Sequence, residues 1–306
     1  MSAASPRQPA LLSGRRAALA VALVAAIIAT AVALGAIVWA LASARGGSDD
    51  SINEFPWPST GDAALAHGDL LAASQGGDSA QPIASLTKLI TALVVLDRAP
   101  LEPGQQGPRF PMTEHDARLA QEEVARGGIS TAVAPGQLFS QRELLEHMLI
   151  TSSNNLSTSL VTRVFGSERD YLVAAREWLD AQGLGGVRIA DASGMSPGNT
   201  ASARDLLTIG KLAAAHPVIA EISGQPSLHT RGGEQSANTN SLLSIPGVTG
   251  LKTGHTPESG HTALLSVALV GSEDPLIVVI LGSPSEAQRA SDATRLIARV
   301  KSEGLG

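Results

Sequence analysis

The stretch Val248-Thr-Gly-Leu-Lys-Thr-Gly-His-Thr256 carries more information about the fold than any other part of this chain. We expect a strand over residues 248–252, which places Lys252-Thr253-Gly254 at the end of that strand. Gly254 has no Cβ, so a bound peptide backbone could lie along the strand edge beside it. Lys252 and Thr253 would offer a positive charge and a hydroxyl to a carboxylate.

Two further short motifs precede this stretch. Ser85-Leu86-Thr87-Lys88 stands at the start of a helix predicted over residues 83–96, where apolar side chains recur at helical spacing. Ser152-Ser153-Asn154 follows a second helix, which Ser140 and Glu143 open with a capping-box pattern. Each motif alone has a bland interpretation as a helix start or a polar turn, but three in this order and context together indicate an active site.

The residue types in these motifs suit acyl transfer. A serine hydroxyl must lose its proton to a base as it attacks, and Lys88 lies on the same helical face as Ser85. Lys88 can be that base only if burial, or a positive neighbour such as Lys252, lowers its pKa. Ser152 could relay a proton and Asn154 could bind a substrate amide. Free N–H groups at the helix start could stabilise an oxyanion.

The order of predicted elements gives the fold class. A strand pair over 63–73 comes first, helices fill the middle, and strands over 248–252, 262–270 and 276–281 precede a last helix that reaches about Lys301. Residues 100–139 are rich in Pro, Gly and charge, and we expect an irregular excursion with a short helix over 114–126. The pattern predicts an α+β domain at 60–303, with a sheet built from both chain ends and an all-helical subdomain.

The N-terminal region predicts a membrane anchor. Ala17 to Ala42 carries no charge, and about 26 residues at roughly 1.5 Å each exceed the roughly 30 Å hydrocarbon core. Arginines cluster before this helix, so residues 1–16 are expected in the cytoplasm, with a linker at 43–59 and the catalytic domain outside the cell. The alternative is a cleaved secretory signal ending at Ala42-Ser43-Ala44, which would make the protein secreted.

Composition excludes several function classes. Residues 1–45 hold four Arg and no acid, so the remainder has 18 basic and 28 acidic side chains, a balance of −10 that argues against a nucleic-acid partner. The chain has no cysteine, which removes thiol nucleophiles and thiolate metal sites. Its seven His form no metal-binding motif, and we expect neither a metal nor a cofactor. Sequence alone leaves the oligomeric state open.

The three motifs and their flanks resemble the serine-type D-alanyl-D-alanine carboxypeptidases, the low-molecular-mass penicillin-binding proteins of peptidase family S11. The resemblance covers roughly residues 60–300. It extends to the segments Gln81–Ala92, Met148–Asn155, Ala192–Met195, Ala203–Leu206, Asn238–Ser241 and Pro246–His255. It implies a β-lactamase/transpeptidase-like fold.

The resemblance also implies a mechanism. Ser85 would attack the penultimate D-Ala carbonyl of a peptidoglycan stem peptide, with Lys88 as base and Ser152 as proton relay. Asn154, Lys252, Thr253 and Gly254 would bind substrate, and the backbone N–H groups of Ser85 and His255 would form the oxyanion hole. β-Lactams would acylate the same serine. Asn155 departs from the family pattern, in which Asp is frequent at this position.

Three other functions stay open at this point. A β-lactamase of the same fold would need a carboxylate that drives water onto the acyl-enzyme, and no E-x-x-x-N element follows Asn154 at a suitable distance. A peptidoglycan DD-endopeptidase would share every motif and differ only in substrate. A non-catalytic wall-binding module would have no need of both a nucleophile and its base.

Overall fold

The computed structural model describes residues 55–230 and 233–302. The predicted cytoplasmic segment at 1–16, the predicted membrane helix at 17–42 and residues 43–54 of the predicted linker therefore lie outside the described residues. A compact unit begins at Phe55, which is buried and lies with its ring centroid 5.4 Å from that of Trp57.

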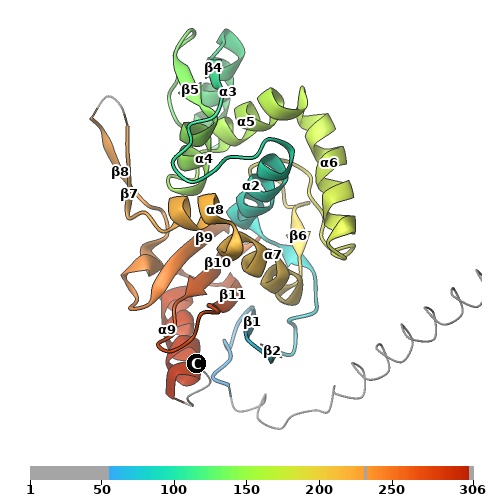
Figure 1. The fold of residues 1–306 in the computed structure, drawn as a ribbon. Helices are drawn as coiled ribbons and strands as arrows, with labels where there is room; N and C mark the ends of the chain where they lie inside the picture. The colour runs from blue at the N-terminus through green and yellow to red at the C-terminus, as the bar shows by residue number, and fades with distance from the viewer. Residues whose placement is uncertain (1–54, 231–232, 303–306) are drawn as a thin grey trace, which may run out of the picture. The chain divides into compact units, whose positions relative to one another are not determined.

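An antiparallel sheet of five strands forms the centre of this unit, in the order β2-β1-β11-β10-β9 (Figure 1). Its strands are β1 (Asp62–His67), β2 (Leu70–Ala73), β9 (Val248–Thr256), β10 (Gly260–Val267) and β11 (Leu276–Ser283). Asp62 pairs with Leu281, so the first strand of the unit lies against its last strand. The prediction that both chain ends build one sheet is confirmed.

Helices cover both faces of the sheet. In β11 the residues Leu276 to Leu281 are all fully buried, and a strand buried on both sides needs a layer on each face. Alternate residues such as Ile277 and Val279 join the core formed with α7 (Ala203–Ala215), whereas the residues between them are not part of that core. The other face packs against α9 (Glu286–Ser302), and Figure 1 shows the sheet between these two helices.

The middle of the chain forms the helical part of the molecule around α2 (Thr87–Arg98), in which residues Thr87 to Leu96 are all buried. The helices around it are α3 (Glu114–Ala125), α4 (Gln141–Leu149), α5 (Asn154–Phe165), α6 (Glu168–Ala181) and α8 (Pro217–Ser223). Among the described residues no single helix is long and apolar enough to cross a membrane. In the same part of the chain, α7 and α8 together have the length and composition of a span, but the pair is bent by 95°.

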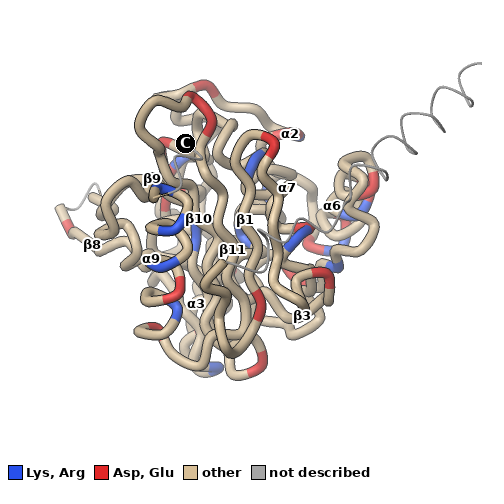
Figure 2. The backbone as a smooth tube through the Cα atoms, turned by 90° about the horizontal axis from the view of Figure 1, so that it is seen from below, with Lys and Arg blue, Asp and Glu red and all other residues tan. Residues whose placement is uncertain are grey.

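The helical part is not all-helical as predicted. Within the excursion at 100–139, β4 (Arg109–Pro111) pairs with β5 (Leu138–Ser140), and α3 occupies nearly the range predicted for it. Further pairs are β3 (Gln81–Pro82) with β6 (Thr200–Ala201) and β7 (Ser227–His229) with β8 (Gln235–Ala237). Figure 2 shows basic and acidic residues interspersed along the described backbone.

Two element boundaries near the motifs differ from the prediction. The helix expected from residue 83 begins as a 3-10 turn, η2 (Ala84–Leu86), before α2 starts at Thr87. The strand expected over 248–252 continues to Thr256, because β10 pairs with it as far as Gly260 opposite Thr256. Lys252-Thr253-Gly254 therefore lies inside a strand and not at its end. A second 3-10 turn, η3 (Ser241–Ser244), precedes this strand.

Candidate active site

Ser85 lies half-buried in the η2 turn, at the junction between the helical part and the sheet. The residue before it, Ala84, has φ +47°, a left-handed conformation that costs a non-glycine residue free energy. Gly194 packs against this peptide so closely that a Cβ there would lie 2.0 Å from the Ala84 carbonyl oxygen. The close packing of Gly194 thus keeps the backbone of Ala84 in the conformation that places Ser85 in the η2 turn.

The Ser85 hydroxyl lies between two possible proton-transfer partners. Lys88 Nζ is 3.1 Å from Ser85 Oγ, and Ser152 Oγ is also 3.1 Å from it. Ser152 belongs to the turn between α4 and α5, and its own φ is +64°. The predicted grouping of a nucleophile, a base and a relay is therefore present as geometry, and each distance permits direct proton transfer.

Lys88 is fully buried, and burial lowers its pKa to about 7 because a charged ammonium loses its hydration there. The negative charges of Asp191 and Glu123 act in the opposite direction. Burial, and not Lys252, is thus the main cause of the low pKa. Near neutral pH a large share of Lys88 is unprotonated and can accept the proton of Ser85.

The Lys88 amine also has partners on its other sides. It donates to the Ser193 carbonyl oxygen at 2.5 Å and to Asn154 Oδ1 at 2.7 Å. The sequence segment Ala192–Met195 belongs to the family resemblance, but its pattern gave no sign that a main-chain carbonyl would contact Lys88. These contacts aim the amine at Ser85.

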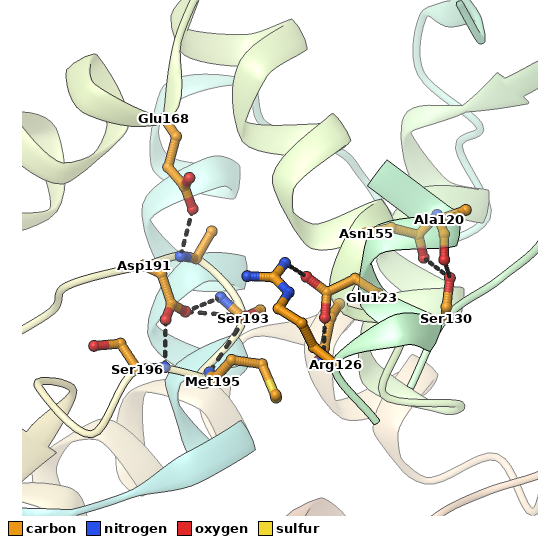
Figure 3. A network of polar contacts seen from close by, with 12 residues as sticks. Ala120, Glu123, Arg126, Ser130, Asn155, Glu168, Asp191, Ser193, Met195 and Ser196 are labelled. Carbon is orange, nitrogen blue, oxygen red and sulfur yellow. Dashed lines mark hydrogen bonds and ion pairs between the residues drawn. The ribbon is translucent and has the colours of Figure 1, made fainter. Parts of the chain in front are cut away.

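Asp191 fixes the loop that carries that carbonyl (Figure 3). Its carboxylate accepts hydrogen bonds from the backbone N–H groups of Ser193 at 2.7 Å, Gly194 at 2.6 Å and Ser196 at 2.6 Å. Glu168 on α6 accepts from the Ala192 N–H at 3.0 Å. The sequence prediction missed Asp191, and its place before the Ala-Ser-Gly-Met segment was the one available signal.

Lys252 and Thr253 face the loop before η3. Lys252 is fully buried and donates to Thr239 Oγ1 at 3.1 Å, and Thr253 Oγ1 donates to the Thr239 carbonyl oxygen at 3.0 Å. Burial lowers the pKa of Lys252 well below its usual value, and the positive charges of Lys88 and Arg289 lower it further. An arriving carboxylate would favour the charged form again. Thr239 lies in a segment that the resemblance covers, but its contact with Lys252 was not predicted.

Gly254 brings β9 against the nucleophile turn. A Cβ at this position would lie 2.7 Å from the Ser85 nitrogen and 2.9 Å from Thr262 Oγ1. The structure therefore gives the glycine a packing reason that the sequence interpretation, which considered only substrate, did not include. The next residue, His255, is exposed, and its ring stacks on that of His261 with centroids 4.1 Å apart.

The amide of Asn154, predicted to bind substrate, is held on two sides. Its Oδ1 accepts from Lys88, and its Nδ2 donates to Glu123 Oε2 at 3.2 Å. Asn155 accepts from the Thr131 N–H and donates to the Thr131 carbonyl oxygen, both at 2.9 Å, so it anchors the start of α5. Within the described ranges no group of three or more His, Cys, Asp or Glu could hold a metal ion.

Comparisons with known proteins identify the family of this chain. The family model of peptidase S11, D-alanyl-D-alanine carboxypeptidase, matches residues 65–285. A D-alanyl-D-alanine endopeptidase of Pseudomonas aeruginosa is 28% identical over 230 residues, which cover 73% of this chain and 70% of the relative. The D-alanyl-D-alanine carboxypeptidase DacB2 of Mycobacterium tuberculosis is 30% identical over 216 residues, 68% of this chain and 69% of the relative.

Solved structures share the fold. Penicillin-binding protein D2 from Listeria monocytogenes, in a cefotaxime-bound form, superposes with a TM-score of 0.64 at 25% identity. The match covers 79% of this chain and 97% of that one.

Proposed function

Because the chain belongs to the peptidase S11 family, the D-alanyl-D-alanine carboxypeptidases, we propose that it removes the terminal D-Ala of peptidoglycan stem peptides through an acyl-enzyme on Ser85. The observation that carries this proposal is the position of Ser85 Oγ, 3.1 Å from both Lys88 Nζ and Ser152 Oγ, with Lys88 fully buried. A buried amine with a pKa near 7 suits a general base at neutral pH.

Substrate binding comes first. The terminal carboxylate of the peptide meets Lys252 and Thr253, and its negative charge favours the protonated form of the Lys252 amine. The peptide backbone lies along β9 beside Gly254. This arrangement puts the carbonyl carbon of the penultimate D-Ala next to Ser85 Oγ.

Acylation then proceeds with a balanced transfer of protons. Ser85 Oγ bonds to the carbonyl carbon while its proton passes to neutral Lys88, and the carbonyl oxygen becomes an oxyanion that accepts from the N–H groups of Ser85 and His255. The C–N bond breaks as the departing amine takes a proton through Ser152, which regains one from Lys88. Terminal D-Ala leaves.

Deacylation reverses these roles. A water molecule attacks the ester carbonyl, its proton passes to Lys88, and Ser85 Oγ recovers a proton as the C–O bond breaks. β-Lactams would enter the first half of this sequence as substrate mimics and acylate Ser85. We also propose that residues 17–42 form the predicted membrane helix and hold the catalytic domain on the outer side of the cell membrane.

A DD-endopeptidase is the second candidate, because the relative from Pseudomonas aeruginosa carries that name. The two activities use the same chemistry and differ in whether the leaving amine belongs to a free D-Ala or to a cross-linked strand. Release of D-Ala from a pentapeptide and cleavage of a cross-linked muropeptide dimer, measured side by side, separate them.

The first test is labelling of the full-length chain with a fluorescent penicillin. We expect a stable adduct on the wild type and on the control variant Ser79→Ala, which replaces an exposed serine, and none on Ser85→Ala. Rapid drug turnover without a lasting adduct would favour a β-lactamase. No adduct and no turnover on folded protein would favour a wall-binding module.

A further inference from the structure

A continuous chain of polar contacts runs from the nucleophile to a carboxylate on α3. Ser85 Oγ contacts Lys88 Nζ, Lys88 contacts Asn154 Oδ1, and Asn154 Nδ2 contacts Glu123 Oε2. This series of contacts ends at Arg126, whose guanidinium forms an ion pair with the other carboxylate oxygen of Glu123 (Figure 3). Neither the three motifs nor the proposed reaction assigns a role to Glu123.

The end of α3 holds Glu123 in the interior, beside Asn154. Glu123 is 5% exposed, whereas Arg126 keeps more than half of its side chain in solvent. The segment after α3 turns back so that the Gly128 N–H donates to the Glu123 carbonyl oxygen and the Asn154 N–H donates to the Ile129 carbonyl oxygen, both at 2.8 Å. These bonds join the end of α3 to the start of α5.

Gly128 leaves room for the contact between Glu123 and Asn154. A Cβ at position 128 would lie 2.5 Å from Glu123 Oε2 and 2.8 Å from Asn154 Nδ2. A larger residue there would part the carboxylate from the amide. The glycine therefore keeps open the space in which the two side chains meet.

An asparagine amide can bind in two orientations, because its oxygen and nitrogen are alike in shape. An ionised carboxylate only accepts hydrogen bonds, so Glu123 can pair with Nδ2 but not with Oδ1. With Nδ2 held by Glu123, Oδ1 must face Lys88, where it accepts from the amine. In the flipped orientation two donors would face each other at Lys88 and two acceptors at Glu123.

We infer, on the basis of the proposed function, that Glu123 is a positioning residue which locks the Asn154 amide toward Lys88 and thereby aims the Lys88 amine at Ser85. Its negative charge adds a second effect. The charged groups that act on the pKa of Lys88 are Asp191 from the loop before β6 and Glu123 from α3, and the Lys88 charge in turn lowers the pKa of Lys252 on β9. Glu123 favours the protonated amine, so its removal should move the titration of Lys88 to lower pH.

The test compares Glu123→Gln with Glu122→Gln, an exposed residue that is its neighbour on α3. The second-order rate of Ser85 acylation by a fluorescent penicillin is measured on the full-length chain from pH 5 to 9. Gln can present either its oxygen or its nitrogen to Asn154, so it no longer selects one orientation. For Glu123→Gln we expect the plateau rate to fall about tenfold and the acid limb to move down by about 0.5 to 1 pH unit. Glu122→Gln should keep both wild-type values.

Gly128→Ala provides a second variant, which keeps the charge of Glu123 but separates the carboxylate from Asn154. Gly128→Ala should lower the plateau rate and shift the acid limb of the pH profile less than Glu123→Gln does. If Glu123→Gln does not fold, Gly128→Ala alone tests the inference. Folded Glu123→Gln with the profile of Glu122→Gln would overturn the inference. So would Gly128→Ala with a wild-type plateau. A wild type that no penicillin labels would instead refute the proposed function.

Discussion

Replacement of Gly254 by alanine tests whether β9 sets the position of the nucleophile. The new Cβ would lie 2.7 Å from the Ser85 nitrogen, 2.9 Å from Thr262 Oγ1 and 3.0 Å from Ala84 Cβ. Ordinary contacts begin at 3.4 Å, so the Ser85 backbone must move by up to about 0.7 Å, and a backbone atom cannot rotate out of the way as a side chain can.

The expected cost follows from that displacement. Overpacking of this size destabilises a fold by about 1 to 3 kcal/mol. A misplacement approaching 1 Å at a reacting group lowers rates by as much as about 100-fold, so we expect Ser85 acylation to slow by roughly 10- to 100-fold. The assay is the second-order rate of labelling by a fluorescent penicillin, with the unfolding free energy measured in urea on the same sample.

Gly185→Ala is the matched control. Gly185 is exposed, and the nearest atom to its added Cβ is Asp180 Oδ1 at 3.9 Å, an ordinary contact. This variant should keep the wild-type rate and stability. If Gly254→Ala also kept both, the close approach of β9 would not constrain Ser85, and the packing argument for Gly254 would be wrong.

Three other predictions concern the titration of Lys88, the buried hydroxyl of Tyr171 and the N-terminal cap of α4. Since the pKa of Lys88 is about 7 and only its neutral form accepts a proton, the wild-type acylation rate should fall about tenfold for each pH unit below that value; a rate that stays flat from pH 5 to 8 would contradict this. Tyr171→Phe removes a buried hydroxyl that lies 2.8 Å from Thr91 Oγ1, and urea unfolding should show a loss of about 1 to 2 kcal/mol. Ser140→Ala removes the capping box of α4 and should cost about 1 kcal/mol in the same assay, while the acylation rate of the folded enzyme stays at the wild-type value.

Features decided by residues close in sequence could be predicted. The capping pattern at Ser140 identified the start of α4, because the cap involves only residues up to three positions apart. The proximity of Lys88 to Ser85 followed from helical spacing, although the helix proved to begin as a 3-10 turn. The meeting of the three motifs was inferred from their order and context and from the family resemblance, and not from their spacing.

Contacts between distant segments could not be predicted. Glu123 is 31 residues from Asn154, and their contact depends on how residues 126–131 turn after α3. The Ser193 carbonyl is 105 residues from Lys88, and a carbonyl group has no signature in the sequence. The strand through Gly254 was predicted too short, because the hydrogen bonds that extend it come from β10 and not from its own residues.

The order of strands in the sheet has a consequence for the nascent chain. Residues Ala63 to Ala66 of β1 are fully buried in the finished molecule, and one edge of β1 pairs with β11 near the far end of the chain. During synthesis β1 and β2 are made early, and one edge of β1 stays unpaired until β11 has been made. A buried strand with an unpaired edge is prone to aggregation. Ser85 is translated early as well, but Gly254 and Lys252 arrive only with the last strands. An incomplete chain can therefore carry Ser85, Lys88 and Ser152 without Lys252 and Gly254, and the site is complete only after β9 has been made.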